Sequence, residues 1–90
     1  MKKITISYLF VGGVTIRGLV RQGKIPTEVG DEISQLFHRC SEIIASDAYS
    51  KEGLSTDYQQ FCKYLLQYPI LDEQLTDIRL EFKEELHYHS

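Results

Sequence analysis

Apolar residues between Val29 and Ile44 recur with the period of an α-helix. Seven residues form the pattern, at successive spacings of 4, 3, 1, 3, 3 and 1: Val29, Ile33, Leu36, Phe37, Cys40, Ile43 and Ile44. Such spacing places them on one face of a helix of 3.6 residues per turn. Pro26 suits a first helical turn, and Glu28 stands near the positive end of the helix dipole. The sequence therefore predicts an amphipathic helix of about five turns that stops near residue 46.

A second stretch with helical spacing follows after a polar segment. Residues 47–55 are polar and contain Gly53, so we expect a loop there, with N-cap candidates at residues 55–57 (Ser-Thr-Asp). The predicted inward face of the next helix is Tyr58, Phe61, Cys62, Leu65 and Leu66. This helix ends near Tyr68, because Pro69 disfavours helix in the residue before it.

The last predicted helix starts at Asp72, which is the expected N-cap. Its apolar stripe has spacings of 3, 4 and 4: Leu75, Ile78, Phe82 and Leu86. Three amphipathic helices joined by short connections pack most simply as an antiparallel bundle.

The first 20 residues admit two interpretations. Every second residue from Ile4 to Phe10 is apolar, and Gly12-Gly13 separates this stretch from a second β-branched one, which favours a β-hairpin over residues 4–17. The alternative is a helix through Tyr8, Val11, Thr15 and Leu19. Its two glycines would cost about 2 kcal/mol relative to alanine, although packing can override that. Either way, a helix is expected over about residues 17–22. The predicted fold class is mainly α: a small antiparallel bundle of three to four helices, with the hairpin as the favoured form of the N-terminal segment.

Size and composition limit the classes of protein that fit. A chain of 90 residues, 42% hydrophobic and 26% charged, is expected to be one folded domain over residues 1–90 with little room for an enclosed active site. Two cysteines are too few for a secreted disulfide framework. We recognise no targeting segment and no apolar stretch of the roughly 20 residues that span a bilayer. The expected location is therefore the cytoplasm, with no membrane partner.

The residues capable of chemistry do not form a recognisable catalytic or metal motif. Cys40 and Cys62 each fall on an apolar stripe, where a thiol acts as a small hydrophobe. His38 and Glu42 have the spacing of a surface pair, and two histidines at residues 87 and 89 do not make a zinc site. Phosphate and dinucleotide loop motifs are absent. We therefore expect no enzymatic activity, no cofactor and no metal.

Charge is divided unevenly along the chain. The net charge is −3, yet residues 1–24 carry five basic residues and no acidic one, and residues 25–90 carry five basic and thirteen acidic residues. Six acidic residues lie in the last predicted helix: Asp72, Glu73, Asp77, Glu81, Glu84 and Glu85. Like charges at i,i+4 slightly destabilise a helix, so the alignment of these carboxylates does not stabilise the helix that carries them. One interpretation is a solvated face; the other is a docking surface for a basic protein.

The basic segment suggests a rival function. Arg17, Arg21 and Lys24 have spacings of 4 and 3, and a Gly-Lys-Ile-Pro turn follows before the next helix, so the region has a superficial helix-turn-helix look. The next helix, however, begins with Glu28 and continues with Asp31, and these carboxylates would meet the phosphate backbone. Direct nucleic-acid binding is therefore disfavoured, and it is kept as part of the alternative of a small regulatory or adaptor domain.

The run Leu-Val-Arg-Gln-Gly-Lys-Ile-Pro-Thr-Glu-Val-Gly-Asp-Glu-Ile opens a segment from Leu19 to Ile44 that resembles small bacterial immunity proteins of the colicin D type. The resemblance continues loosely through residues 58–66 and the acidic helix 71–86. The front differs, since family members begin with a helix. The resemblance implies a bacteriocin immunity protein: a stoichiometric toxin inhibitor that covers the basic cleft of a tRNA-cleaving nuclease with carboxylates. We therefore expect a non-enzymatic binding protein whose acidic last helix contacts a basic nuclease.

Overall fold

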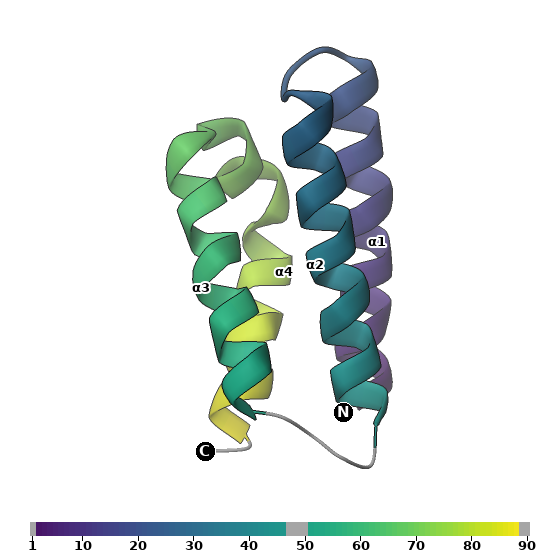
Figure 1. The fold of residues 1–90 in the computed structure, drawn as a ribbon, viewed down its shortest axis with the longest axis vertical. Helices are drawn as coiled ribbons and strands as arrows, with labels where there is room; N and C mark the ends of the chain where they lie inside the picture. The colour runs from purple at the N-terminus through teal and green to yellow at the C-terminus, as the bar shows by residue number, and fades with distance from the viewer. Residues whose placement is uncertain (1, 47–50, 89–90) are drawn as a thin grey trace.

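The computed structural model describes residues 2–46 and 51–88, which form four α-helices in an antiparallel up-and-down bundle (Figure 1). The helices are α1 (Lys2–Arg21), α2 (Thr27–Ala45), α3 (Lys51–Gln67) and α4 (Pro69–Tyr88). Helix α1 packs against α2 and α4, and α3 packs against the same two helices. The predicted helical bundle is therefore confirmed. The start of α1 and the end of α4 lie at the same end of the bundle (Figure 1).

The prediction of a β-hairpin over residues 4–17 is wrong, because this segment lies within α1. The buried positions of α1 follow helical spacing: Leu9, Gly12, Ile16 and Leu19. At Gly12 a Cβ atom would lie 2.7 Å from Cε2 of Phe37 and 2.8 Å from Cδ1 of Ile78. The glycine therefore lets α1 approach α2 and α4 closely. This tertiary packing outweighs the low helix propensity that made a hairpin attractive.

Helix α2 confirms the strongest sequence pattern. Its buried residues are Gly30, Ile33, Leu36, Phe37, Cys40 and Ile44, while the predicted positions Val29 and Ile43 are half-buried against the core. Gly30 marks a second close approach, since a Cβ atom there would lie 2.4 Å from Cγ2 of Val20 on α1. The α1–α2 pair is thus held together by two glycine contacts as well as by its apolar stripes.

The turn between α1 and α2 has a standard glycine C-cap. Gly23 has φ of +71°, the left-handed conformation that glycine adopts without steric cost. The amide of Lys24 donates to the carbonyl of Leu19, and the amide of Gly23 donates to the carbonyl of Val20, each at 3.0 Å. These two bonds form a Schellman motif. Ile25 is buried directly after it, which fixes the chain before α2 begins.

Helix α3 begins earlier than predicted. Residues 51–55, expected to be loop, are helical, so the N-cap predicted at residues 55–57 is also wrong; residues 47–50 of that loop lie outside the described residues. The physical reason is Leu54, which is fully buried and precedes Phe61 by seven residues on the same face. The predicted inward residue Leu66 is 85% exposed, and Tyr64 is buried instead. Helix α3 ends at Gln67, before Pro69, as predicted.

Helix α4 begins at Pro69, so Asp72 lies within its first turn and is not the N-cap. Proline is well suited to the first helical position, because its fixed φ matches the helix and its missing N–H is not needed there. The backbone departs from helical geometry at Leu75 (φ −117°, ψ 18°), which kinks the helix. The predicted stripe is confirmed: Leu75, Ile78 and Phe82 are buried and Leu86 packs against the core.

Aromatic rings connect three of the helices in the interior. Phe61 of α3 contacts Phe37 of α2 edge to face, with ring centroids 5.1 Å apart, and stacks on Phe82 of α4 at 6.2 Å. Tyr58 adds a tilted contact to Phe82 at 5.0 Å. These ring contacts join α3 to both of its neighbours, α2 and α4. Large aromatic side chains dominate burial in small cores, so the cluster contributes much of the buried apolar surface.

Candidate functional site

The outer face of α4 presents most of the predicted acidic residues to solvent. Glu73, Asp77 and Glu84 are exposed, and Leu80 lies among them with 47% of its surface exposed. Asp77, Leu80 and Glu84 have spacings of 3 and 4, so they follow one another along one side of the helix. The structure therefore places two of the six predicted carboxylates, Asp77 and Glu84, on either side of an exposed leucine, with Glu73 before the non-helical residue Leu75.

The kink at Leu75 changes how the first two acidic residues are presented. Asp72 and Glu73 precede the kink, so they do not continue the helical register of Asp77. Oδ1 of Asp72 also lies 3.6 Å from Nε of Arg79, which partly offsets the charge of this exposed carboxylate. The predicted unbroken line of carboxylates at i,i+4 is thus interrupted after its first turn.

Glu81 and Glu85 do not belong to the exposed acidic face. Glu85 is only 4% exposed, Glu81 is half-buried, and both take part in interactions within the protein. Their prediction as partner-binding residues is not supported by these positions. Glu85 follows Phe82 by three residues and Ile78 by seven, which places it on the inward stripe of α4. The sequence alone contains this spacing, which predicts an inward position for Glu85 in spite of its charge.

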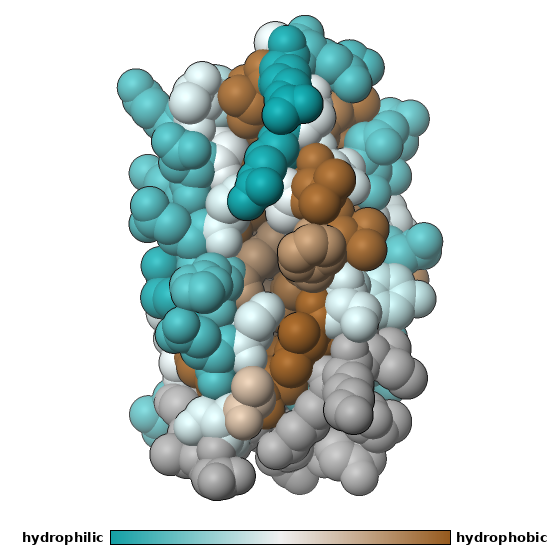
Figure 2. Space-filling model, turned by 90° about the vertical axis from the view of Figure 1, so that its right-hand side faces the viewer, coloured by the Kyte–Doolittle hydropathy of each residue, from teal (hydrophilic) through white to brown (hydrophobic). Residues whose placement is uncertain are grey.

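A second surface, on α1, was not predicted. Four large hydrophobic side chains are exposed there: Tyr8 at 38%, Phe10 at 74%, Val11 at 57% and Val14 at 55%. Figure 2 shows an apolar band along the boundary between α1 and α2, bordered by hydrophilic side chains. The band includes a shallow groove with a volume of about 290 Å³.

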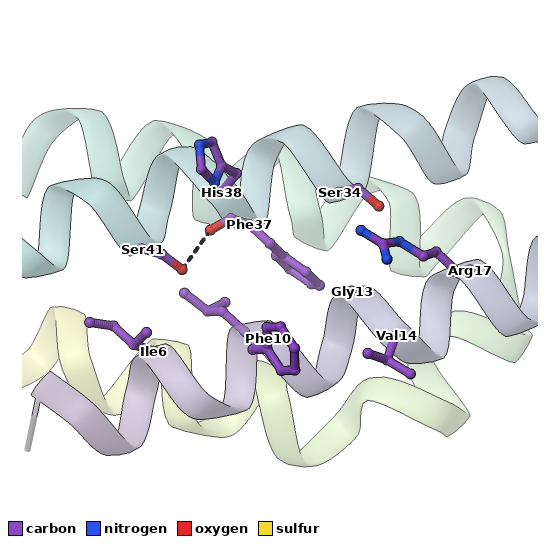
Figure 3. Close-up of a pocket in the computed structure, with 10 residues that line it drawn as sticks. Ile6, Phe10, Gly13, Val14, Arg17, Ser34, Phe37, His38 and Ser41 are labelled. Atoms are coloured by element: carbon purple, nitrogen blue, oxygen red, sulfur yellow. Dashed lines mark hydrogen bonds between the residues drawn. The ribbon is translucent and has the colours of Figure 1, made fainter.

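Both helices contribute to the walls of the groove. Ten residues line it: Ile6, Leu9, Phe10, Gly13, Val14 and Arg17 from α1, and Ser34, Phe37, His38 and Ser41 from α2. In Figure 3, Phe37 lies between the two helices, and the hydroxyl of Ser41 donates to its carbonyl at 3.0 Å. The groove thus has an apolar floor with polar groups along the α2 rim.

Gly13 keeps this groove open. A Cβ atom at Gly13 would meet nothing within 4 Å, and the same holds for Gly18 further along α1. Glycine inside a helix costs about 1 kcal/mol relative to alanine. At Gly12 and Gly30 internal packing explains this cost, but nothing within the described chain does so at Gly13 and Gly18. The outer side of α1 therefore carries small residues and exposed apolar residues that the fold does not require.

Charged groups border the α1 surface. Arg17 and Arg21 are exposed, and among the described residues neither forms an ion pair. Asp31 of α2 lines the same adjoining groove as both arginines. On the other rim, Nε2 of His38 lies 3.0 Å from Oε1 of Glu42, as the i,i+4 spacing predicts. A phosphate approaching the arginines would therefore meet a carboxylate beside them.

The buried thiol belongs to a polar link between α2 and α3. Sγ of Cys40 donates to Oδ2 of Asp57 over 3.8 Å, and Nη2 of Arg39 donates to Oδ1 of the same carboxylate at 3.1 Å. Burial, followed by the nearby charge of Asp57, raises the pKa of the Cys40 thiol far above its ordinary value. Cys40 is thus a protonated core residue, as predicted.

The other thiol lies between α3 and α4. Cys62 is half-buried rather than a core residue. Burial and the hydrogen bond with Cys62 raise the pKa of the neighbouring Tyr58. No group of three or more His, Cys, Asp or Glu side chains that could hold a metal ion occurs in residues 2–46 and 51–88. His89, one of the two C-terminal histidines, is outside the described residues.

Comparison with family models, curated proteins and solved structures finds no significant match to this chain. Within the described segments, none of the helices combines the length and apolar character that crossing a bilayer requires. The fold and surfaces thus define a small four-helix bundle with two distinct exposed faces, an acidic face on α4 and an apolar groove with basic residues on α1.

Proposed function

We propose that this chain is a non-enzymatic binding protein that docks a basic protein partner on the outer face of α4. The observation that carries the proposal is the exposed leucine, Leu80, surrounded by the exposed carboxylates of Asp77 and Glu84, with Glu73 beyond the kink. Protein interfaces commonly combine a small desolvated apolar centre with a polar rim. An acidic rim of this kind selects a cationic surface and accelerates association with it.

The fold itself does not use these carboxylates. Among the described residues, Glu73, Asp77 and Glu84 form no ion pair, in contrast to Asp72 and its contact with Arg79. Repulsion between neighbouring like charges on a helix is slightly destabilising. A small stability cost with no internal compensation is what a surface kept for a partner would show.

We further propose that the partner is a cationic nuclease, with this chain acting in the cytoplasm as its immunity protein or antitoxin. Carboxylates on α4 would occupy the positions where the nuclease binds substrate phosphates, which blocks its cleft. The resemblance to colicin D-type immunity proteins supports this partner class, and the helical α1 agrees with the helix that begins those proteins. Direct nucleic-acid binding through Arg17, Arg21 and Lys24 has less support, because Asp31 lines the same groove as the two arginines.

The test compares charge reversals on α4 with charge reversals on α1 in pull-downs from the native cell. The acidic-face variant carries Glu73→Lys, Asp77→Lys and Glu84→Lys, which avoids the half-buried Glu81 and the buried Glu85. The control carries Arg17→Glu and Arg21→Glu on α1. We expect the wild-type chain and the control to retain the partner, and the acidic-face variant to lose it, with unchanged helicity by circular dichroism. Binding should also weaken as NaCl rises from about 50 to about 500 mM, because salt screens exposed charges.

The same experiment identifies the partner class. A toxin or secreted effector encoded beside this gene, captured by the wild-type chain and inhibited by it at a 1:1 ratio, would support the immunity function. If the acidic-face variant captures the same protein as well as the wild-type chain does, the α4 docking surface is wrong. Tight binding of random DNA at low salt, lost in the α1 control, would instead favour the nucleic-acid alternative.

A further inference from the structure

The outer faces of α1 and α4 carry matching patterns of opposite charge. On α1, Val14, Arg17 and Arg21 follow one another at spacings of 3 and 4. On α4, read in the reverse direction, Leu80, Asp77 and Glu73 have the same spacings. All six side chains are exposed, and Val14 and Leu80 are two of the large apolar residues that the bundle leaves in solvent.

Helix geometry turns this match into a register. Residues three and seven positions apart on a helix are separated by about 4.5 and about 10.5 Å along its axis. Suppose that α1 of one chain runs antiparallel to α4 of a second chain, with Val14 opposite Leu80. The spacing of three residues on each helix then places Arg17 opposite Asp77. The next spacing, of four residues, sets Arg21 toward Glu73, which lies beyond the Leu75 kink. The Arg17–Asp77 pair is thus the contact that the register fixes.

The groove on α1 has room for an incoming apolar side chain at this level. Gly13 lines the groove beside Val14 and Arg17, and apart from its chain neighbours and the adjacent backbone of α1 nothing lies within 4 Å of the position of its missing Cβ. Phe10, 74% exposed, forms the next part of the same wall. A leucine from another helix would cover apolar surface that is otherwise in water, which is favourable by roughly 25 cal/mol per Å² buried.

We propose that the α1 groove binds α4 of a second copy of this chain. Charge complementarity selects this occupant: residues 1–24 contain five basic residues and no acidic one, and α4 carries exposed carboxylates around Leu80. Among the described residues, neither Arg17 nor Asp77 has an ion-pair partner within its own chain. The inference does not rest on the proposed function, although a basic partner on α4 would compete with this self-association.

The contact is heterologous, because each copy offers a different surface to the next one. Such contacts form rings when the rotation closes and open chains when it does not. Self-association by this route therefore increases with protein concentration. It also weakens with salt, since Arg17 and Asp77 are exposed.

The test is sedimentation velocity of the full chain from about 10 to about 500 µM at low ionic strength. We expect the weight-average mass of the wild-type protein to rise above that of the monomer with concentration. Asp77→Lys and Arg17→Glu should each reduce the association constant at least about tenfold, because each places like charges opposite each other. Combining Asp77→Lys with Arg17→Glu in one chain, or mixing the two single variants, should restore association. Glu32→Lys is the matched control, since it changes the net charge as Asp77→Lys does, at an exposed residue of α2 that lies toward α3 and outside both the α1 groove and the outer face of α4.

A second variant tests the groove without changing charge. Gly13→Leu fills the groove from α1 and replaces a weak helix former with a strong one. We expect helicity and melting temperature to be kept or raised while association falls at least about tenfold. A wild-type protein that stays monomeric over the whole concentration range overturns the inference. So does equal weakening by Asp77→Lys and Glu32→Lys, or failure of the charge swap to restore association. Loss of self-association in Arg17→Glu with the outside partner still captured would leave the proposed function intact.

Discussion

Helices α1 and α4 have the same length of 20 residues and pack against each other, but their exposed faces differ. Helix α1 exposes Phe10, Val11 and Val14 with arginines beyond them, while α4 exposes carboxylates around Leu80 alone. The buried faces are alike in that apolar residues at helical spacing dominate both, with Gly12 added on α1 and Glu85 on α4. Burial therefore specifies where each helix sits, and the outer face is left free to specify what it binds.

The largest expected effect separates the inner and outer faces of α4 itself. Phe82 and Leu80 are two residues apart, but Phe82 is fully buried in the aromatic cluster and Leu80 is on the surface. Phe82→Ala should lower the free energy of unfolding by about 3–5 kcal/mol, because it leaves a cavity in the core. Leu80→Ala should change it by less than about 0.5 kcal/mol. Urea denaturation monitored by circular dichroism measures both, and similar losses would contradict the assignment of Leu80 to the surface.

The second effect separates the two sides of α1 at neighbouring glycines. Gly12→Ala should destabilise the protein by about 1–3 kcal/mol, because the new methyl group overlaps Phe37 and Ile78. Gly13→Ala should stabilise it by about 0.5–1 kcal/mol, since alanine is the better helix former and the site is open. Thermal melts of the two variants should therefore shift in opposite directions. A shift of the same sign in both would show that α1 does not use Gly12 for close packing.

The third prediction distinguishes the core from both outer faces by the pH dependence of the free energy of unfolding. The pKa of Cys40 is raised in the folded state by burial and by Asp57, so an unfolded chain releases this proton first. Stability from this group is complete below the usual thiol pKa of about 8.5 and declines above it, by up to about 1.4 kcal/mol per pH unit. Cys40→Ala should lose this decline, while Arg17→Glu and Asp77→Lys should keep it. Urea titrations at several pH values between 7.5 and about 9.5 measure the slope.

The smallest effect concerns the charges themselves. Asp77→Lys relieves repulsion with neighbouring carboxylates on α4 and should stabilise the protein by only a few tenths of a kcal/mol. Arg17→Glu removes an exposed charge without an internal ion pair and should have an effect of similar size. A loss above about 1 kcal/mol in either variant would mean that the charge belongs to the fold and not to the interface.

The sequence predicted those elements whose apolar spacing is regular and failed where a glycine was decisive. The stripes of α2 and α4 were sufficient to place both helices, because local spacing and tertiary packing agree there. Gly12 and Gly53 were interpreted as breaks, whereas both lie inside helices. Gly12 is helical because it lies in close contact with Phe37 and Ile78, which are 25 and 66 positions further along the chain. Contacts of that range cannot be deduced from spacing in one sequence.

The sequence predicted that the last helix has an acidic face, but not which of its carboxylates are exposed on that face. Composition identified the acidic helix, and the structure exposes Glu73, Asp77 and Glu84 as expected. Glu85 was included because of its charge, although its spacing from Phe82 assigns it to the buried stripe. The α1 groove was missed, because Phe10 and Val14 were assigned to a hairpin. The signal that could have found it was the helical spacing of Phe10, Val14, Arg17 and Arg21, which has meaning only once the segment is known to be a helix.

The Schellman turn at Gly23 has a consequence for the order in which the bundle forms. Its two hydrogen bonds join residues at most five positions apart, so the reversal of the chain requires no distant contact. The helices on either side then meet through residues close in sequence, such as Val20 and Gly30. Assembly driven by short-range contacts is fast, in the microsecond to millisecond range for small helical domains. We therefore expect the α1–α2 hairpin to be structured in the folding transition state, with α3 and α4 completing the core after it.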